Sequence, residues 1–102
     1  MANAETATVN KTKKALKEPP LFKVIFINDN TTTVEFVIES LIEFFDYNSD
    51  TAEQITIDIH EAGAATVAVL PFEIAEQKGV EVTLRARAEN FPLHIKLEPD
   101  NG

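Results

Sequence analysis

Three polar side chains with hydrogen-bonding capacity follow a hydrophobic stretch early in the chain: Asn28, Asp29 and Asn30. Thr32 and Glu35 have the spacing of a capping box, in which a Thr hydroxyl accepts from a helix N–H and the Glu reaches back to the cap residue. A helix is therefore expected to begin beside the three polar residues. Residues of these types often do no more than form turns, but they also place amide and carboxylate oxygens where a strand meets a helix.

The second group with possible chemistry is Ile59-His60-Glu61-Ala62-Gly63. Gly63 stands where a left-handed C-terminal cap belongs, which puts His60 in the last turn of a helix. A histidine there often interacts only with the helix dipole and the last carbonyls. Beside Asn28 it would have a second role, because an amide oxygen and a neutral imidazole nitrogen are acceptors that suit a charged amine. The two groups together predict a site that holds a free α-amino group.

The chain lacks the residues that a nucleophilic, zinc-binding or phosphate-binding site requires. Ser40 and Ser49 have no nucleophile-elbow glycines around them, and the chain has no cysteine. His60 has no second histidine four residues on, as a helical zinc site needs, and the three glycines lie too far apart for a phosphate-binding loop. We therefore expect no catalytic residues, no metal and no cofactor.

The pattern of apolar residues predicts six elements in the order β-α-α-β-α-β. Asp50 and Glu53 are expected to cap the second helix, and Pro71 to start the third, whose interior Gly79 costs roughly 1 kcal/mol relative to Ala. The elements span about 22–27, 33–46, 51–62, 64–70, 71–90 and 93–98.

The chain divides into a core and two tails. Residues 1–20 are polar, lack apolar periodicity and end in Pro19-Pro20, so they are expected to form a flexible tail. Residues 21–98 are expected to form a single core domain, followed by a C-terminal tail at 99–102. The net charge is −8, and four lysines against two glutamates in the first tail leave −10 for the remainder.

This acidic surface excludes some partners. It would repel phosphate backbones and anionic lipid, so no nucleic acid and no membrane partner is expected. The apolar runs also fall short of the roughly 20 residues that a membrane helix needs. Without cysteines or a targeting segment, the chain suits a reducing cytoplasm, and a short acidic chain is expected to be a monomer.

Several short motifs occur in a fixed order from about Ala15 to Glu98 and resemble the ClpS family, the adaptors of Clp proteases that recognise N-terminal degrons. The residues that carry the resemblance are Phe22-Lys23-Val24-Ile25, Asn28-Asp29-Asn30, Thr32, Glu35-Phe36-Val37, Ala52-Glu53, Ile59-His60-Glu61-Ala62-Gly63, Ala75-Glu76-Gln77-Lys78, Ala86-Arg87-Ala88-Glu89-Asn90 and Pro92-Leu93.

The resemblance implies an α+β fold, a three-stranded antiparallel sheet packed by three helices, and a protein that is not an enzyme. Its partners would be N-degron substrates and the N-terminal domain of a Clp AAA+ unfoldase, ClpA-like or ClpC-like. Its location would be the bacterial cytoplasm, with the plastid stroma as the alternative.

The resemblance also implies roles for individual residues. Asn28 and His60 would hold the α-amino group of the substrate, with help from Asp29. Two residues of the third helix, Glu73 and Lys78, match positions that face the unfoldase. The pocket for a large apolar first side chain would be formed by Asn30, Thr32, Val34, Val37, Thr56, Ile59 and Leu93.

The chain departs from the usual family pattern at four of these positions. Asn30 replaces a second Asp, and Thr33 stands where Pro usually opens the helix. Val34 replaces a Met that acts as a gate against β-branched first residues. Thr56 occupies a position that is commonly apolar and would bring a hydroxyl into the pocket.

Two other classes of function remain open. A similar order of strands and helices occurs in the C-terminal domain of the bacterial ribosomal stalk protein, so the chain could be a different non-enzymatic interaction domain. A small acid-base enzyme is the second possibility, and it would need His60 or Asp58 to face a sizeable cleft.

Overall fold

The structure is a computed structural model that describes residues 19–101. Its elements confirm the expected order, with each boundary within about two residues of the prediction. They are β1 (Leu21–Ile27), α2 (Val34–Phe45), α3 (Ser49–Ala62), β2 (Ala64–Pro71), α4 (Phe72–Ala88) and β3 (His94–Pro99). All but the last two residues of the expected flexible tail, residues 1–20, lie outside the described residues. Strand β3 runs one residue past the expected end of the core.

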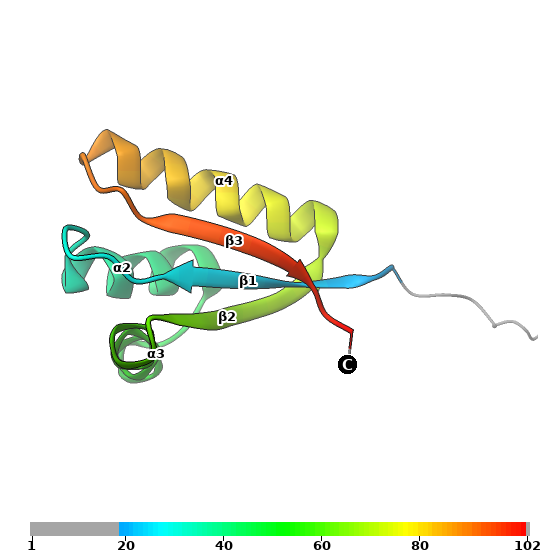
Figure 1. The fold of residues 1–102 in the computed structure, drawn as a ribbon, viewed down its shortest axis with the longest axis horizontal. Coiled ribbons are helices and arrows are strands. Elements are labelled where there is room, and N and C mark those ends of the chain that lie inside the picture. The colour runs from blue at the N-terminus through cyan, green and yellow to red at the C-terminus, as the bar shows by residue number, and fades with distance from the viewer. Residues whose placement is uncertain (1–18, 102) are drawn as a thin grey trace, which may run out of the picture.

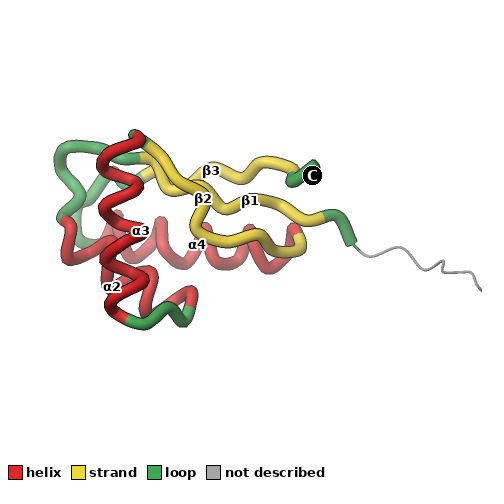
Figure 2. Tube along the Cα trace, turned by 90° about the horizontal axis from the view of Figure 1, so that it is seen from below, coloured by secondary structure: helices red, strands yellow, loops and turns green. Residues whose placement is uncertain are grey.

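The three strands form one antiparallel sheet in the order β2-β1-β3. Strand β1 lies between the other two; its alternate residues Val24 and Phe26 are fully buried, whereas Ile25 and Ile27 between and after them are partly exposed. Helix α4 contacts all three strands and runs alongside β3, α2 packs beside α4, and α3 packs against α2 and β2 (Figures 1 and 2). The α+β fold of three helices and a three-stranded antiparallel sheet is confirmed.

The hydrophobic core lies between this sheet and the helices. Val24 and Phe26 of β1 are fully buried, and Leu41 of α2 and Val82 of α4 are buried with them. The ring of Phe26 meets that of Phe45 edge to face, with centroids 5.9 Å apart. Burying a large apolar side chain contributes roughly 1.5–3 kcal/mol, so this cluster fixes α2 and α4 on the sheet.

The N-terminal caps of α2 and α3 differ from the prediction. Thr33, not Thr32, caps α2, and its hydroxyl accepts from the N–H of Phe36 at 3.1 Å. Asn48, not Asp50, caps α3 by accepting from the N–H of Thr51 at 2.9 Å. In both places two residues that can cap a helix are close in sequence. Contacts with residues outside the helix determine which of the two caps it.

The other helix ends agree with the sequence. Gly63 ends α3 with φ 88°, the left-handed conformation that glycine adopts without strain. Pro71 precedes α4, which has no side-chain cap. None of the helices within residues 19–101 combines the length and hydrophobicity needed to cross a bilayer.

The two ends of the sheet carry different features. The loop after β1 and the junction of α3 with β2 lie at one end, on the left of Figure 1. The chain enters β1 and leaves β3 at the opposite end, where the N–H of Asp100 donates to the carbonyl of Leu21 at 2.8 Å.

Candidate functional site

A backbone hydrogen bond joins the two polar groups that the sequence singles out. The N–H of Asn28 donates to the carbonyl of Gly63 at 2.9 Å, one residue beyond the pairing of Ile27 with Ala64. The N–H of Gly63 in turn donates to the carbonyl of Ile59 at 2.9 Å. The end of β1 is thus fixed to the last turn of α3, the turn that carries His60.

Asp29 organises the loop between β1 and α2. Its Oδ1 accepts from the backbone N–H groups of Thr31 at 2.8 Å and Thr32 at 2.6 Å. Its Oδ2 accepts from the Thr32 hydroxyl at 2.8 Å. These bonds hold both the backbone and the hydroxyl of Thr32 against Asp29 in the loop, and it is the hydroxyl of Thr33 that caps α2.

These hydrogen bonds change the pKa of the Asp29 carboxyl group. Partial burial raises the pKa of its carboxyl group, but the hydrogen bonds from Thr32 and Thr31 lower it, and the positive charge of Arg87 adds to them. The hydrogen bonds and the charge prevail, so the pKa of Asp29 lies below its ordinary value. The loop therefore holds a carboxylate next to Asn28.

A pocket of about 220 Å³ opens between this loop, α2 and α3. An apolar cavity of about 150 Å³ is enough to hold benzene, so the pocket has room for one large side chain. Asn28 and His60, the two residues predicted to bind the amine, both line it. Its lining residues are Asn28, Asp29, Asn30, Thr32, Thr33, Val34, Val37, Thr56, Ile59 and His60.

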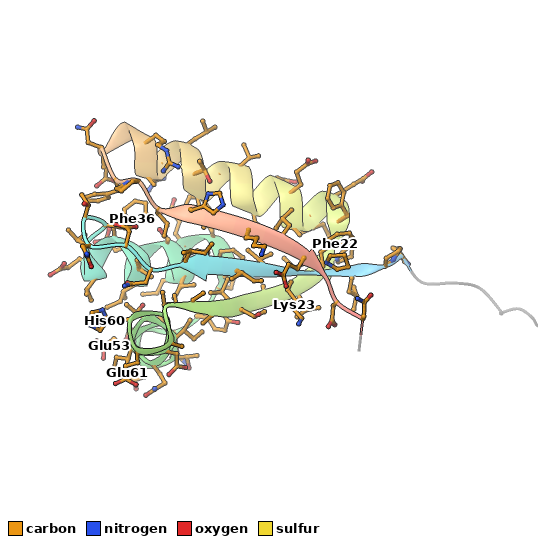
Figure 3. The ribbon with its side chains drawn as sticks, viewed as in Figure 1. Phe22, Lys23, Phe36, Glu53, His60 and Glu61 are labelled. Carbon is orange, nitrogen blue, oxygen red and sulfur yellow. The ribbon has the colours of Figure 1, made fainter. Side chains whose placement is uncertain are left out.

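The pocket has a buried apolar floor and an exposed polar rim. Val37, Thr56 and Ile59 are buried, whereas Asn30 and His60 are exposed. Val34 stands at the mouth with 57 % of its surface exposed. Figure 3 shows the His60 and Glu61 side chains projecting from α3 at this end of the molecule, far from Phe22 near the start of β1.

The hydroxyl of Thr56 has a partner within its own helix. It donates to the carbonyl of Ala52 at 2.7 Å, a bond that buried Thr residues commonly make to the preceding turn. The pocket floor therefore does not contain the unsatisfied hydroxyl that the sequence suggested, and the γ-methyl group of Thr56 is left to serve as an apolar surface.

Three predicted residues are not part of this pocket. Leu93 does not line it: the side chain is 1 % exposed and packs in the hydrophobic core, because it directly precedes β3 on the side that faces the helices. Glu73 and Lys78 lie on α4, the former in its exposed first turn. They belong to a separate surface.

Two residues with roles around the site were not revealed by the sequence: Thr33 lines the pocket, and Arg87, outside it, acts on the charge of Asp29. Arg87 donates to the carbonyls of Phe91 and Leu93, each at 2.9 Å, and so holds the turn between α4 and β3 near Asp29. Thr33 could have been found, since Thr is a favoured N-cap residue and it directly precedes the apolar run that begins at Val34. The contacts of Arg87 depend on tertiary structure and leave no local pattern.

The site offers hydrogen-bond acceptors beside an apolar cavity. Asn28, Asp29 and His60 carry amide, carboxylate and imidazole acceptors, which match the donors of an ammonium group. Within residues 19–101, no cluster of three His, Asp or Glu side chains has the arrangement of a metal site. The arrangement suits binding of an amine that carries an apolar side chain.

Comparison with known proteins confirms the family resemblance. The family model of the ATP-dependent Clp protease adaptor protein ClpS matches residues 17–96. The ClpS proteins of Campylobacter jejuni and Roseobacter denitrificans are 40 % and 38 % identical to the chain. The alignments cover 94 % and 96 % of this chain, and 98 % and 87 % of theirs.

A solved structure of a ClpS protein is also similar to the chain. Agrobacterium tumefaciens ClpS2 bound to L-phenylalaninamide superposes with a TM-score of 0.79 at 36 % identity, over 81 % of this chain and all of that one. The chain belongs to the ClpS family of Clp protease adaptor proteins.

Proposed function

We propose that this adaptor binds substrates through a bulky hydrophobic N-terminal residue and delivers them to a Clp AAA+ unfoldase. The observation that carries the proposal is the convergence of Asn28 and His60, from separate elements, on one pocket of about 220 Å³. L-phenylalaninamide, the ligand of the Agrobacterium relative, has a free α-amino group and one aromatic side chain. Both features have counterparts in this pocket.

The α-amino group is bound by charge-assisted hydrogen bonds. The side-chain oxygen of Asn28 and an imidazole nitrogen of His60 accept from the ammonium group, and the Asp29 carboxylate favours its positive charge. The first side chain enters the cavity and covers Val37, Ile59 and the methyl group of Thr56. Each full burial of such a side chain contributes roughly 1.5–3 kcal/mol.

Delivery uses a different part of the molecule. Glu73 and Lys78 on α4 face the N-terminal domain of a ClpA-like or ClpC-like unfoldase, and the N-terminal tail, residues 1–20, acts in the transfer. The adaptor performs no catalysis, acts as a monomer and works in the bacterial cytoplasm. Separating the two surfaces lets the protein hold a substrate and the unfoldase at the same time.

The test is a binding titration with a short peptide that begins with Phe. Asn28→Ala and His60→Ala should each weaken binding by roughly tenfold or more, because each removes a hydrogen bond to a charged group worth about 1.5–3 kcal/mol. His94→Ala is the matched control, since His94 is exposed on β3 and does not line the pocket. Unchanged affinity in both site variants, with the fold intact by circular dichroism, would overturn the proposal.

A further inference from the structure

The loop that carries the predicted amine-binding residues is held at both edges of β1. On the β2 side, the N–H of Asn28 donates to the carbonyl of Gly63 at 2.9 Å. On the β3 side, Ile27, the last residue of β1, pairs with His94, the first residue of β3. The position of Asn28 therefore depends on where β3 begins as well as on where α3 ends.

Arg87, near the end of α4, fixes the start of β3. Its Nη1 atom donates to the carbonyls of Phe91 and Leu93, each at 2.9 Å. Leu93 directly precedes β3, so one of the two bonds holds the residue next to His94. Hydrogen bonds from a charged donor are roughly twice as strong as those between neutral groups. The guanidinium group thus ties the turn between α4 and β3 to the end of α4.

The same turn contacts the start of α2. The ring of Phe91 meets the ring of Phe36 edge to face, with centroids 5.2 Å apart. Phe36 is buried, and its N–H donates at 3.1 Å to the hydroxyl of Thr33, which lines the pocket. Arg87 is therefore connected to the loop by two sets of contacts, one through β3 and one through Phe91.

The positive charge of Arg87 also acts on this loop. Partial burial raises the pKa of the Asp29 carboxyl group, whereas the hydrogen bonds from Thr32 and Thr31 and the charge of Arg87 lower it. Arg87 does not line the pocket, so its charge acts on Asp29 from outside the site. Both the contacts and the charge of Arg87 are directed at the segment that follows β1.

We propose that Arg87 is a positioning residue for recognition of the substrate's α-amino group: it holds the turn before β3 and, through that turn, fixes the loop that carries Asn28 and Asp29. The proposal rests on the function proposed above, because it takes these two residues to bind the amine. Hydrogen bonds weaken steeply when donor and acceptor are misaligned. A loosened loop should therefore discriminate less in favour of a free amino group.

The test compares two peptides that begin with Phe and have either a free or an acetylated α-amino group. The quantity measured is the ratio of the two affinities. Partial unfolding lowers the apparent affinity for both peptides by the same factor, so a residue that acts only on stability leaves this ratio unchanged. In Arg87→Ala the ratio should fall roughly three- to tenfold, the size of effect known for residues that contact no ligand.

Two further variants separate position from overall charge. A lysine ammonium group can donate to two carbonyls, as Nη1 does, so Arg87→Lys should keep most of the ratio. Arg85→Ala is the matched control, because it removes the same charge from the same helix but breaks an ion pair with Glu43 instead. If Arg87→Ala leaves the ratio unchanged, or Arg85→Ala lowers it as much, the positioning role is overturned. Equal affinity of the wild type for both peptides would overturn the proposed function, and this role with it.

Amide resonances of the free protein test the same role without a ligand. The N–H groups of Thr31 and Thr32 donate to Asp29, so their chemical shifts report on the loop. Both should change in Arg87→Ala and stay near their wild-type values in Arg85→Ala. Changes confined to the turn between α4 and β3 would mean that Arg87 closes the turn without positioning the loop, and would overturn the proposal.

Discussion

At the scale of single residues, Asp29 is the side chain that gives the binding loop its shape. Its carboxylate accepts three hydrogen bonds from Thr31 and Thr32, and Asn28 precedes it directly. The predicted amine-binding group Asn28 is therefore held between this loop and the carbonyl of Gly63. We expect the charge of Asp29 to stabilise the loop in addition to its proposed role toward the ligand.

The lowered pKa of Asp29 predicts how this contribution depends on pH. A carboxyl group whose pKa is lower in the folded than in the unfolded state stabilises the fold at pH values above its ordinary pKa of 3.8. The stabilisation is lost as the pH falls through the folded-state pKa. Asp29→Asn keeps an acceptor oxygen but loses the charge, so it should destabilise the protein near pH 7 and progressively less below about pH 4.

Urea unfolding of both proteins at neutral and acidic pH measures this difference in the free energy of unfolding. A difference of the same size at both pH values would mean that the charge of Asp29 does not stabilise the loop.

We expect Val34 to govern which first residues can enter the pocket, because it is one of the residues that line it. It stands at the mouth in place of the larger Met that is usual in the family, and it is stiff about χ1. Peptides that begin with Ile or Val should therefore bind within about tenfold of Leu, a difference of roughly 1.4 kcal/mol. Val34→Met should increase the penalty for Ile while leaving Leu and Phe nearly unchanged. If the wild type already rejects Ile as strongly as the variant does, the selectivity lies elsewhere, in Thr56 or Ile59.

Single residues also show what the sequence could and could not reveal about the site. Asn28 and His60 could be predicted to share a site because each carries a hydrogen-bond acceptor, Asn28 after the first strand and His60 in the last turn of a helix. The structure brings both to one pocket. The choice of Thr33 over Thr32 as the cap depended on Asp29, three residues from Thr32. Leu93 begins the alternating pattern Leu93, Ile95, Leu97 of the last strand, a pattern that by itself favours the core rather than the pocket.

At the scale of secondary structure, two glycines have opposite roles. Gly63 ends α3 with φ 88°, and an added Cβ would meet no atom within 4 Å. Gly79 lies inside α4, where an added Cβ would lie 3.5 Å from the Ile95 side chain, an ordinary contact. The cost of Ala at Gly63 is therefore backbone strain alone, whereas Ala at Gly79 meets no obstacle.

Gly63→Ala should destabilise the protein by about 1–2 kcal/mol, because a non-glycine residue resists the left-handed conformation. Gly79→Ala should stabilise it by about 0.5–1 kcal/mol, since glycine is a poor helix former. Denaturant unfolding of the two variants side by side provides the measurement. A stabilising Gly63→Ala, or a clearly destabilising Gly79→Ala, would refute this account of the two helix positions.

The elements were largely predictable because their apolar periods are clear. The start of α3 was not, because Asn48, Ser49 and Asp50 can all cap a helix. The hydroxyl of Tyr47 donates to the carbonyl of Val67 and so fixes the chain just before Asn48. A contact between residues twenty apart in sequence decided where the helix begins.

At the scale of the whole molecule, the proposed substrate pocket and the entry of the chain are at opposite ends. Residues 28–33 lie at one end of β1, and Pro20 precedes the other end (Figure 1). A strand of this length spans roughly 20 Å. The expected roles of the two regions, holding the substrate and engaging the unfoldase, are thus separated along the sheet. The antiparallel arrangement was implied by the family resemblance, whereas the exact junction between Asn28 and Gly63 required the structure.

The most direct test of the central claim compares two peptides that begin with Phe and differ only in whether the α-amino group is free or acetylated. Acetylation removes the charge and most of the donors, so two hydrogen bonds of about 1.5–3 kcal/mol each should be lost. The acetylated peptide should then bind well over tenfold more weakly, and the ratio should shrink in His60→Ala but not in His94→Ala. Equal affinity of the wild-type protein for both peptides would contradict recognition of a free N-terminus.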